Sequence, residues 1–131
     1  MIVLDTHVLI WDALTPKQLS AAARRAIVQA NQQEGIIIAD ISLWEIAMLV
    51  EKKRVQVALG SQAFLNLILQ AHKAIVQPIT AEIATLAVHF PAGISKDPAD
   101  RLIAATTLTK NATLITADKN LQNTNLIPTL W

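Results

Sequence analysis

Four short apolar runs constrain the fold of this 131-residue chain more than any other feature of its sequence. They cover residues 2–4, 36–39, 74–77 and 113–116. Each run is bounded by polar residues or turn formers and is followed by a helical pattern, and none shows the alternation of a half-exposed strand. Strands that alternate with helices predict right-handed βαβ crossovers. We therefore expect an α/β fold, a three-layer α/β/α domain with a central, mostly parallel sheet.

Cap and turn residues predict where the helices begin and end. Thr15 is expected to cap a helix that has Pro16 at its first position, continues through residues 17–34 and ends at Gly35. The other helices are expected over residues 42–53, 62–72, 81–89 and 97–110.

Composition favours one well-buried domain over residues 1–131. Hydrophobic residues make up 53% of the chain and charged residues 16%, which excludes a disordered protein. The longest uncharged stretch, residues 55–71, contains polar side chains and falls short of the ~20 apolar residues that span a bilayer. The chain has no cysteine and its first residues show no signal peptide, so we expect a cytoplasmic protein without membrane segments.

Acidic side chains recur where the predicted strands end and the helices begin. Asp5 directly follows the first run, Asp118 lies two residues beyond the fourth, and Glu45 lies in the first turn of the helix after the second. Asp97 and Asp100 open a further helix. Ligands of open parallel sheets bind beyond the carboxyl ends of the strands, so we expect these acids to converge.

Converging carboxylates favour a divalent cation. They repel one another and raise each other's pKa unless a cation that prefers oxygen neutralises them, which favours Mg²⁺ or Mn²⁺. Zinc fits less well, because the chain has no cysteine and His7, His72 and His89 show no ligand spacing. Water on such an ion is a better nucleophile, and the ion stabilises a phosphate under attack. The pattern predicts hydrolytic cleavage of phosphodiester bonds by one or two ions.

Each acid also has a purely structural interpretation. Glu45 can be the partner of Ser42 in a capping box, because the two have S-x-x-E spacing. Asp97 can be a plain N-cap, and Asp100 can complement a helix dipole. Asp118 can belong to a turn. For Asp5 no such interpretation is satisfactory, since an acid immediately after an apolar strand needs a partner.

Four blocks spread over the chain carry a family resemblance. They are residues 4–11 (LDTHVLIW), 41–47 (ISLWEIA), 97–106 (DPADRLIAAT) and 114–119 (LITADK). No single block is decisive. In this order and at this spacing they resemble the PIN domain family, and within it the VapC-type toxins of bacterial toxin–antitoxin pairs.

The resemblance implies a ribonuclease that depends on Mg²⁺ (or Mn²⁺). The acids that it implies for catalysis and for metal binding are Asp5, Glu45, Asp100 and Asp118. The supporting residues are expected to be Thr6, Ser42, Asp97 and Thr116. The family's third acid falls on Asp100, directly before Arg101, and Asp97 is auxiliary.

The resemblance also implies partners beyond the RNA substrate. They are a second copy of the chain, in a homodimer, and a small antitoxin protein that inserts a segment near the acidic pocket and blocks it. An Arg of that segment can pair with the carboxylates. Apolar residues occupy nearly every direction around the helix at residues 64–69, which fits either a fully buried helix or a face for another protein. Trp44 is expected to pack against the protein rather than to stack on bases.

Three other classes of function can be weighed against this pattern: a noncatalytic PIN-like domain, a phosphoaspartyl phosphatase or receiver module, and a dinucleotide-binding fold. A noncatalytic PIN-like RNA-binding or scaffolding domain would lose one or more acids, and all four are present. A phosphoaspartyl phosphatase needs D-x-D after its first strand, where this chain has Asp5-Thr6-His7. A receiver module would leave Glu45 and Asp100 without a role. No G-x-G-x-x-G motif or P-loop follows any predicted strand, which disfavours a dinucleotide-binding fold.

Overall fold

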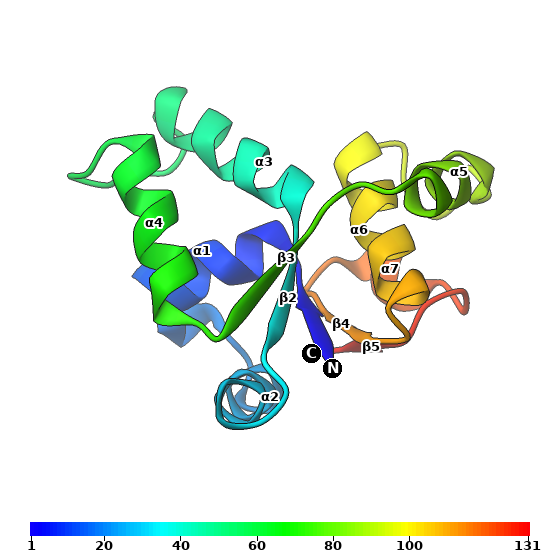
Figure 1. Cartoon of the computed structure of the whole chain (residues 1–131), viewed down its shortest axis with the longest axis horizontal. Coiled ribbons are helices and arrows are strands. Elements are labelled where there is room, and N and C mark those ends of the chain that lie inside the picture. Colours follow the sequence, from blue (N-terminus) through cyan, green and yellow to red (C-terminus); the bar gives the residue numbers. More distant parts are fainter.

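The computed structural model describes all 131 residues, and strands and helices alternate along them (Figure 1). The elements in chain order are β1 (Ile2–Leu4), α1 (Thr6–Leu14), the 3₁₀ turn η1 (Pro16–Gln18), α2 (Ala21–Gln32), β2 (Ile36–Ala39), α3 (Asp40–Glu51), α4 (Ser61–Ala71), β3 (Ala74–Gln77), α5 (Ala81–His89), α6 (Pro98–Thr109), β4 (Thr113–Ile115), α7 (Lys119–Asn123) and β5 (Thr129–Leu130). No helix is long and apolar enough to cross a membrane.

All five strands are parallel and lie in the order β3-β2-β1-β4-β5. The central strand β1 pairs with β2 on one side and with β4 on the other. The chain builds outward from β1 through β2 and β3, then returns to add β4 and β5 on the opposite side. This reversal creates a switch point between β1 and β4, where open α/β sheets bind ligands. The mostly parallel sheet predicted from the sequence is confirmed.

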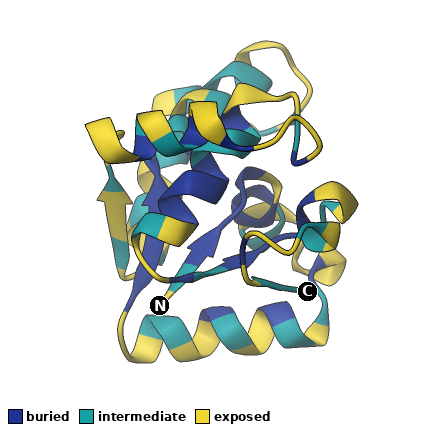
Figure 2. Cartoon of the chain, turned by 90° about the vertical axis from the view of Figure 1, so that its right-hand side faces the viewer, coloured by how far each residue is buried: buried dark blue, intermediate teal, exposed yellow.

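Two apolar clusters cover the two faces of the sheet. Alternate residues of β2 serve different clusters, since Ile37 packs with α5, α6 and α7 whereas Ile36 and Ile38 pack with α1, α2 and α4. In Figure 1 the helices α1 to α4 lie on one side of the strands and α5 to α7 on the other. Figure 2 shows the buried residues concentrated on the strands and on the helix sides that face them. Because both faces of the inner strands β1, β2 and β4 are covered, these strands need apolar side chains.

The single helix predicted over residues 17–34 is wrong, because the chain breaks between η1 and α2. Thr15 makes no side-chain capping bond. Ser20 caps α2 instead, by accepting a hydrogen bond from the N–H of Ala23 at 3.0 Å. The break places Leu19 in the core, where its side chain is only 5% exposed.

Helix α3 begins earlier than predicted. Its N-cap is Ala39 and its first residue is Asp40, so β2 runs directly into the helix with no residue left for a side-chain cap. Ser42 lies inside the first turn and is buried, and Glu45 lies in the second turn. The predicted capping box is therefore wrong. Trp44 is 60% exposed on the outer side of α3, so the prediction that it packs is also wrong.

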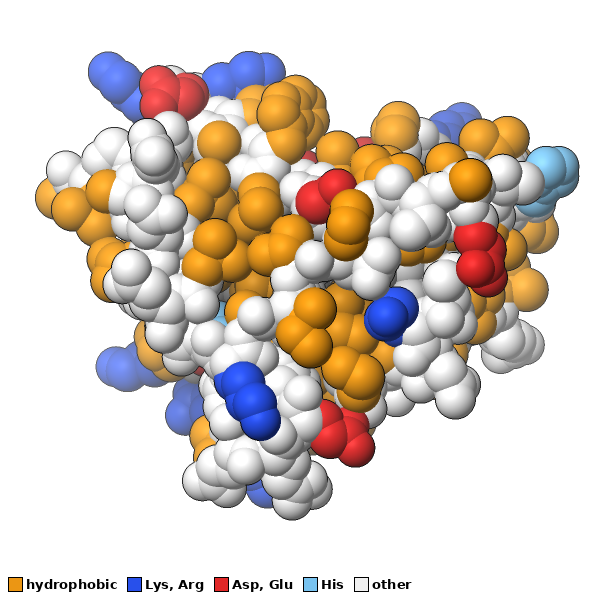
Figure 3. Space-filling model, viewed as in Figure 1, with side chains coloured by type: hydrophobic (Ala, Val, Ile, Leu, Met, Phe, Trp, Pro, Cys, Tyr) orange, Lys and Arg blue, Asp and Glu red, His pale blue; other side chains and the backbone are white.

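Helix α4 is buried on one side only. Phe64 and Ile68 belong to the core, whereas Leu67 is 52% exposed. The face in Figure 3 shows apolar side chains over the region of α4 and β3, and Ile75 and Val76 of β3 are exposed as well. Of the two interpretations of this helix, the structure favours one that leaves an apolar face uncovered by the chain itself.

The two-residue strand β5 was not predicted, because a segment this short produces no periodic pattern. The fourth apolar run also ends one residue earlier than expected, at Ile115. Thr116 therefore lies just beyond β4, with its N–H donating to the carbonyl of Leu130 at 3.2 Å and its side chain next to Asp5.

Candidate active site

Five acidic side chains line one pocket of about 310 Å³ at the carboxyl edge of the sheet. Asp5 follows β1 and Asp118 follows β4, so both flank the switch point. Glu45 comes from α3, and Asp97 and Asp100 come from the head of α6. The structure thus brings together every acid that the sequence predicts to converge.

Asp5 forms the buried end of the pocket and is only 8% exposed. Its Oδ1 accepts a hydrogen bond from the N–H of Thr6 at 2.8 Å, which caps α1, and its Oδ2 accepts one from Thr116 Oγ1 at 2.7 Å. Burial raises the pKa of the Asp5 carboxyl, the two hydrogen bonds oppose this rise, and the charge of Asp118 adds to it. Asp5 is therefore firmly oriented but poorly compensated as an anion.

Thr116 links the ends of β1 and β4. Its buried hydroxyl donates to Asp5 and accepts from the backbone N–H of Asp118 at 3.0 Å. Asp118 Oδ1 in turn accepts from the N–H of Leu121 at 3.1 Å and caps α7. One threonine thus fixes the relative positions of two acids that are far apart in the sequence.

Glu45 is held by the hydroxyl of Thr6, which in turn contacts the hydroxyl of Ser42. Thr6 Oγ1 lies 2.5 Å from Glu45 Oε1 and 3.0 Å from Ser42 Oγ. Because a threonine hydroxyl has one proton, Thr6 can donate to Glu45 while Ser42 donates to Thr6. Burial raises the pKa of Glu45, the bond from Thr6 lowers it, and the charges of Asp97 and Asp5 raise it further. Thr6 and Ser42 therefore lie where supporting residues are expected.

The two aspartates of α6 have different environments. Asp97 Oδ1 caps the helix by accepting from the N–H of Ala99 at 2.9 Å. Asp100 lies in the first turn, and its Oδ2 accepts from Ser95 Oγ at 2.9 Å. Burial raises the pKa of Asp100 to about 7, against the effect of the Ser95 hydrogen bond and with the help of the charges of Asp5, Asp97 and Asp118.

The pocket is also lined by two aromatic residues that are not among the site residues predicted from the sequence. His7 and Trp11 line it from α1, four residues apart, with ring centroids 6.0 Å from each other. When protonated, His7 lowers the pKa of Asp5 and of Glu45. The signal was present in the sequence, since residues at i and i+4 share one face of a helix that begins at Thr6 after Asp5 as its N-cap.

The donor set fits a hard divalent cation. The carboxylates of Glu45, Asp100 and Asp118 each have one oxygen bonded to protein, and the other accepts no hydrogen bond from the chain. Free carboxylate oxygens without thiolates are the ligands that Mg²⁺ prefers. No three His, Asp or Glu side chains are yet arranged to hold one ion, so an ion would have to draw the carboxylates closer together.

The chain belongs to the PIN domain family, since the model of that family matches residues 2–126. Among characterised proteins, Ribonuclease VapC22 of Mycobacterium tuberculosis (strain ATCC 25618 / H37Rv) is 35% identical over 122 residues, which are 93% of this chain and 90% of the relative.

Solved structures share the fold at lower identity. VapBC2 from Rickettsia felis, bound to a DNA fragment from its promoter, has a TM-score of 0.73 at 18% identity and matches 99% of this chain and 98% of its own. A toxin–antitoxin complex from Klebsiella pneumoniae has a TM-score of 0.68 at 17% identity and matches 100% of this chain and 97% of its own. These likenesses show the fold alone.

Proposed function

We propose that the protein is a metal-dependent ribonuclease and the toxin of a toxin–antitoxin pair. The observation that carries the proposal is the gathering of acids from four separate segments into one pocket at the switch point of a PIN fold. The 35% identity to Ribonuclease VapC22 supports the same activity.

We propose Mg²⁺ or Mn²⁺ as the cofactor, held by Asp5, Glu45, Asp100 and Asp118. When bound, such an ion activates water and stabilises the charge on a phosphate under attack. Raised pKa values at Asp5, Glu45 and Asp100 support the assignment, because a cation stabilises the ionised form of partly desolvated carboxyls that lack a counter-charge.

The residues of the chain itself orient the acids. Thr116 holds Oδ2 of Asp5 and Thr6 holds Oε1 of Glu45, so the orientation of each carboxylate is fixed. His7 and Trp11 offer an exposed ring and a partly exposed ring beside the acids. Aromatic rings next to the site of cleavage suit single-stranded RNA, whose bases can stack on them.

A groove along α1 supports the antitoxin proposal. The acidic pocket adjoins a second pocket, because His7 and Trp11 line both. The second pocket adjoins a third, largely apolar pocket beside α4, because Leu14 and Gln56 line both. This groove fits an antitoxin segment that is basic at one end and apolar at the other. Cleavage that persists with the antitoxin bound would contradict the proposal.

A cytoplasmic location and a homodimer are also proposed. The homodimer is supported by the exposed apolar side chains of Trp44 on α3 and Val88 on α5.

The function is tested by incubating the purified protein with single-stranded RNA. Cleavage should require added Mg²⁺ or Mn²⁺ and should stop with EDTA. Asp5→Asn should reduce the rate at least about 100-fold, because it removes a ligand charge. The fold should survive, since asparagine also caps a helix. Cleavage that withstands both EDTA and Asp5→Asn would refute the metal mechanism, and RNA binding without cleavage would support the noncatalytic alternative.

A further inference from the structure

Arg101 follows Asp100 on α6, yet its guanidinium lies against backbone carbonyl groups and forms no ion pair. Nε donates to the carbonyl of Ala87 at 2.9 Å, Nη1 to those of Ser95 at 3.0 Å and Pro91 at 3.3 Å, and Nη2 to those of Val88 at 3.2 Å and Phe90. All the acceptors belong to the last turn of α5 or to the loop over residues 90–97 that connects it to α6.

Four of these carbonyls accept no hydrogen bond from a backbone N–H, whereas that of Pro91 also accepts one from Ile94 at 3.1 Å. The last carbonyls of a helix have no partner within it, and a loop supplies none by repetition. A guanidinium carries five N–H donors in a rigid fork, and here it serves five carbonyls. Arg101 therefore fixes the path of the α5–α6 loop, and a lysine would reach fewer of these acceptors.

The loop carries Ser95, which reaches into the site. Its carbonyl is held by Arg101 at 3.0 Å, and its hydroxyl donates to Asp100 Oδ2 at 2.9 Å. The same hydroxyl accepts from the backbone N–H of Asp97 at 3.0 Å. A continuous chain of contacts thus runs from the Arg101 guanidinium through Ser95 to the carboxylate of Asp100.

We propose that Arg101 and Ser95 are positioning residues that hold the Asp100 carboxylate in the orientation that a metal ion needs. This inference rests on the proposed function, in which Asp100 binds the ion. Without Ser95 the carboxylate can rotate about its side-chain bonds, and without the Arg101 fork the loop that carries Ser95 can move. Partners of metal ligands typically contribute about 10-fold or more to metal affinity.

Mn²⁺ binding to the full chain, followed by the electron paramagnetic resonance signal of free Mn²⁺, tests the proposal without RNA. Ser95→Ala and Arg101→Lys should each weaken Mn²⁺ binding about 10-fold, whereas Ser95→Thr, which keeps the hydroxyl, should bind nearly as wild type. In an Asp100→Asn background, Ser95→Ala should have no further effect. Should Arg101→Lys fail to fold, the Ser95 variants decide the outcome.

Thr107→Val provides a control for general destabilisation. Thr107 is buried on α6 and donates to the Ile103 carbonyl at 2.9 Å, away from the pocket. Loss of the Thr107 hydroxyl should lower the melting temperature and leave Mn²⁺ affinity unchanged. Two results would overturn the positioning roles alone. One is a folded Ser95→Ala variant that binds Mn²⁺ with wild-type affinity. The other is a Ser95→Ala substitution that weakens Mn²⁺ binding as much in the Asp100→Asn background as in the wild type. Wild-type Mn²⁺ binding and RNA cleavage by Asp100→Asn would overturn the metal-binding role of Asp100 as well.

Discussion

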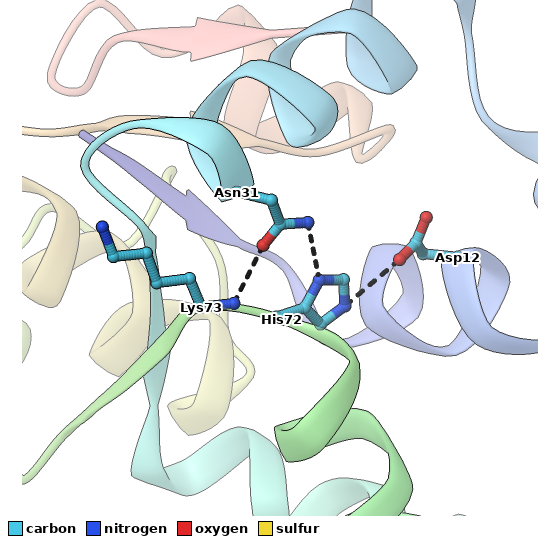
Figure 4. A network of polar contacts seen from close by, with 4 residues as sticks. All are labelled: Asp12, Asn31, His72 and Lys73. Atoms are coloured by element: carbon cyan, nitrogen blue, oxygen red, sulfur yellow. Dashed lines mark hydrogen bonds and ion pairs between the residues drawn. The ribbon is translucent and has the colours of Figure 1, made fainter.

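The acidic pocket and the network of Asp12, Asn31, His72 and Lys73 (Figure 4) both join distant segments through polar groups. Only in the network does the buried titratable side chain have complementary partners from the chain itself. The His72 side chain is 4% exposed, and its Nε2 lies 3.1 Å from Asp12 Oδ2 (Figure 4). Its Nδ1 lies 3.2 Å from Asn31 Nδ2, while Asn31 Oδ1 accepts from the N–H of Lys73 at 3.0 Å. Every polar atom of the His72 ring therefore has a complementary neighbour.

The acidic pocket has the opposite character. Asp5 is buried and Glu45 and Asp100 are half-buried, with no basic side chain paired to any of them, and the pKa of each is raised chiefly by desolvation. A cluster that only holds helices together gains nothing from such an arrangement. The difference teaches that uncompensated charge, more than burial of polar groups as such, distinguishes a candidate functional site from a network that serves stability.

The largest effect on stability is expected where the satisfied network is broken. His72→Ala should lower the free energy of unfolding by about 2–3 kcal/mol, because it leaves a cavity and removes the common partner of Asp12 and Asn31. Urea denaturation measures this. The same substitution at the exposed His89 should change stability by less than about 0.5 kcal/mol. A stable His72→Ala that no longer cleaves RNA would show that the network belongs to the active site.

The uncompensated pocket should make stability depend on pH in the metal-free protein. The pKa of folded Asp100, about 7, lies above its unfolded value of 3.8, so the folded state binds more protons between these values and stability falls as pH rises through them. Asp100→Asn should remove this loss, so the free energy of unfolding of the variant should exceed that of the wild type by about 1–2 kcal/mol at pH 8. The full shift would correspond to about 4 kcal/mol, but screening at a partly exposed group reduces it.

Thermal melts with EDTA at pH 4 and pH 8 measure this dependence. The advantage of Asp100→Asn should shrink toward pH 4, where wild-type Asp100 is protonated. Added Mg²⁺ should reverse it at pH 8, since only the wild type keeps the ligand. An advantage of equal size at both pH values would mean that Asp100 is not the group that titrates.

The smallest effect is expected at Asp97. Asp97→Asn should lower stability by about 0.5 kcal/mol, because asparagine caps a helix as well as aspartate does and only the charge near the helix dipole is lost. Cleavage should fall less than about 10-fold, whereas Asp100→Asn should abolish it. The two substitutions, compared by cleavage rate and urea denaturation, decide which aspartate is the third ligand. The reverse pattern would assign that role to Asp97.

The fold could be predicted because its strands are apolar throughout and alternate with helices. Asp5 and Asp118 could be placed together because both follow strands of the same parallel sheet. The sequence could not reveal that Ser42 supports Thr6 instead of capping α3, since both roles fit the same S-x-x-E spacing. The exposure of Trp44 was equally hidden, because it depends on which side of α3 faces the sheet.

Ser95 and Arg101 mark the limit of reasoning from motifs. Their contacts span the loop over residues 90–97, whose path is set by tertiary hydrogen bonds and follows no periodic rule. From the sequence, an arginine next to an acidic residue suggests an ion pair, but the Arg101 guanidinium donates hydrogen bonds to backbone carbonyl groups instead. Irregular segments of this kind need coordinates before their residues can be assigned.

The position of Asp5 at the end of the middle strand affects how the molecule opens. Its backbone N–H still donates to the carbonyl of Ile115 at 3.1 Å, which continues the pairing of β1 with β4. Strands bonded on both sides are usually the last to exchange their amide hydrogens with solvent. Fraying of α3 or of the α5–α6 loop would therefore leave this carboxylate in place, and the two helices that supply Glu45 and Asp100 would reassemble around it.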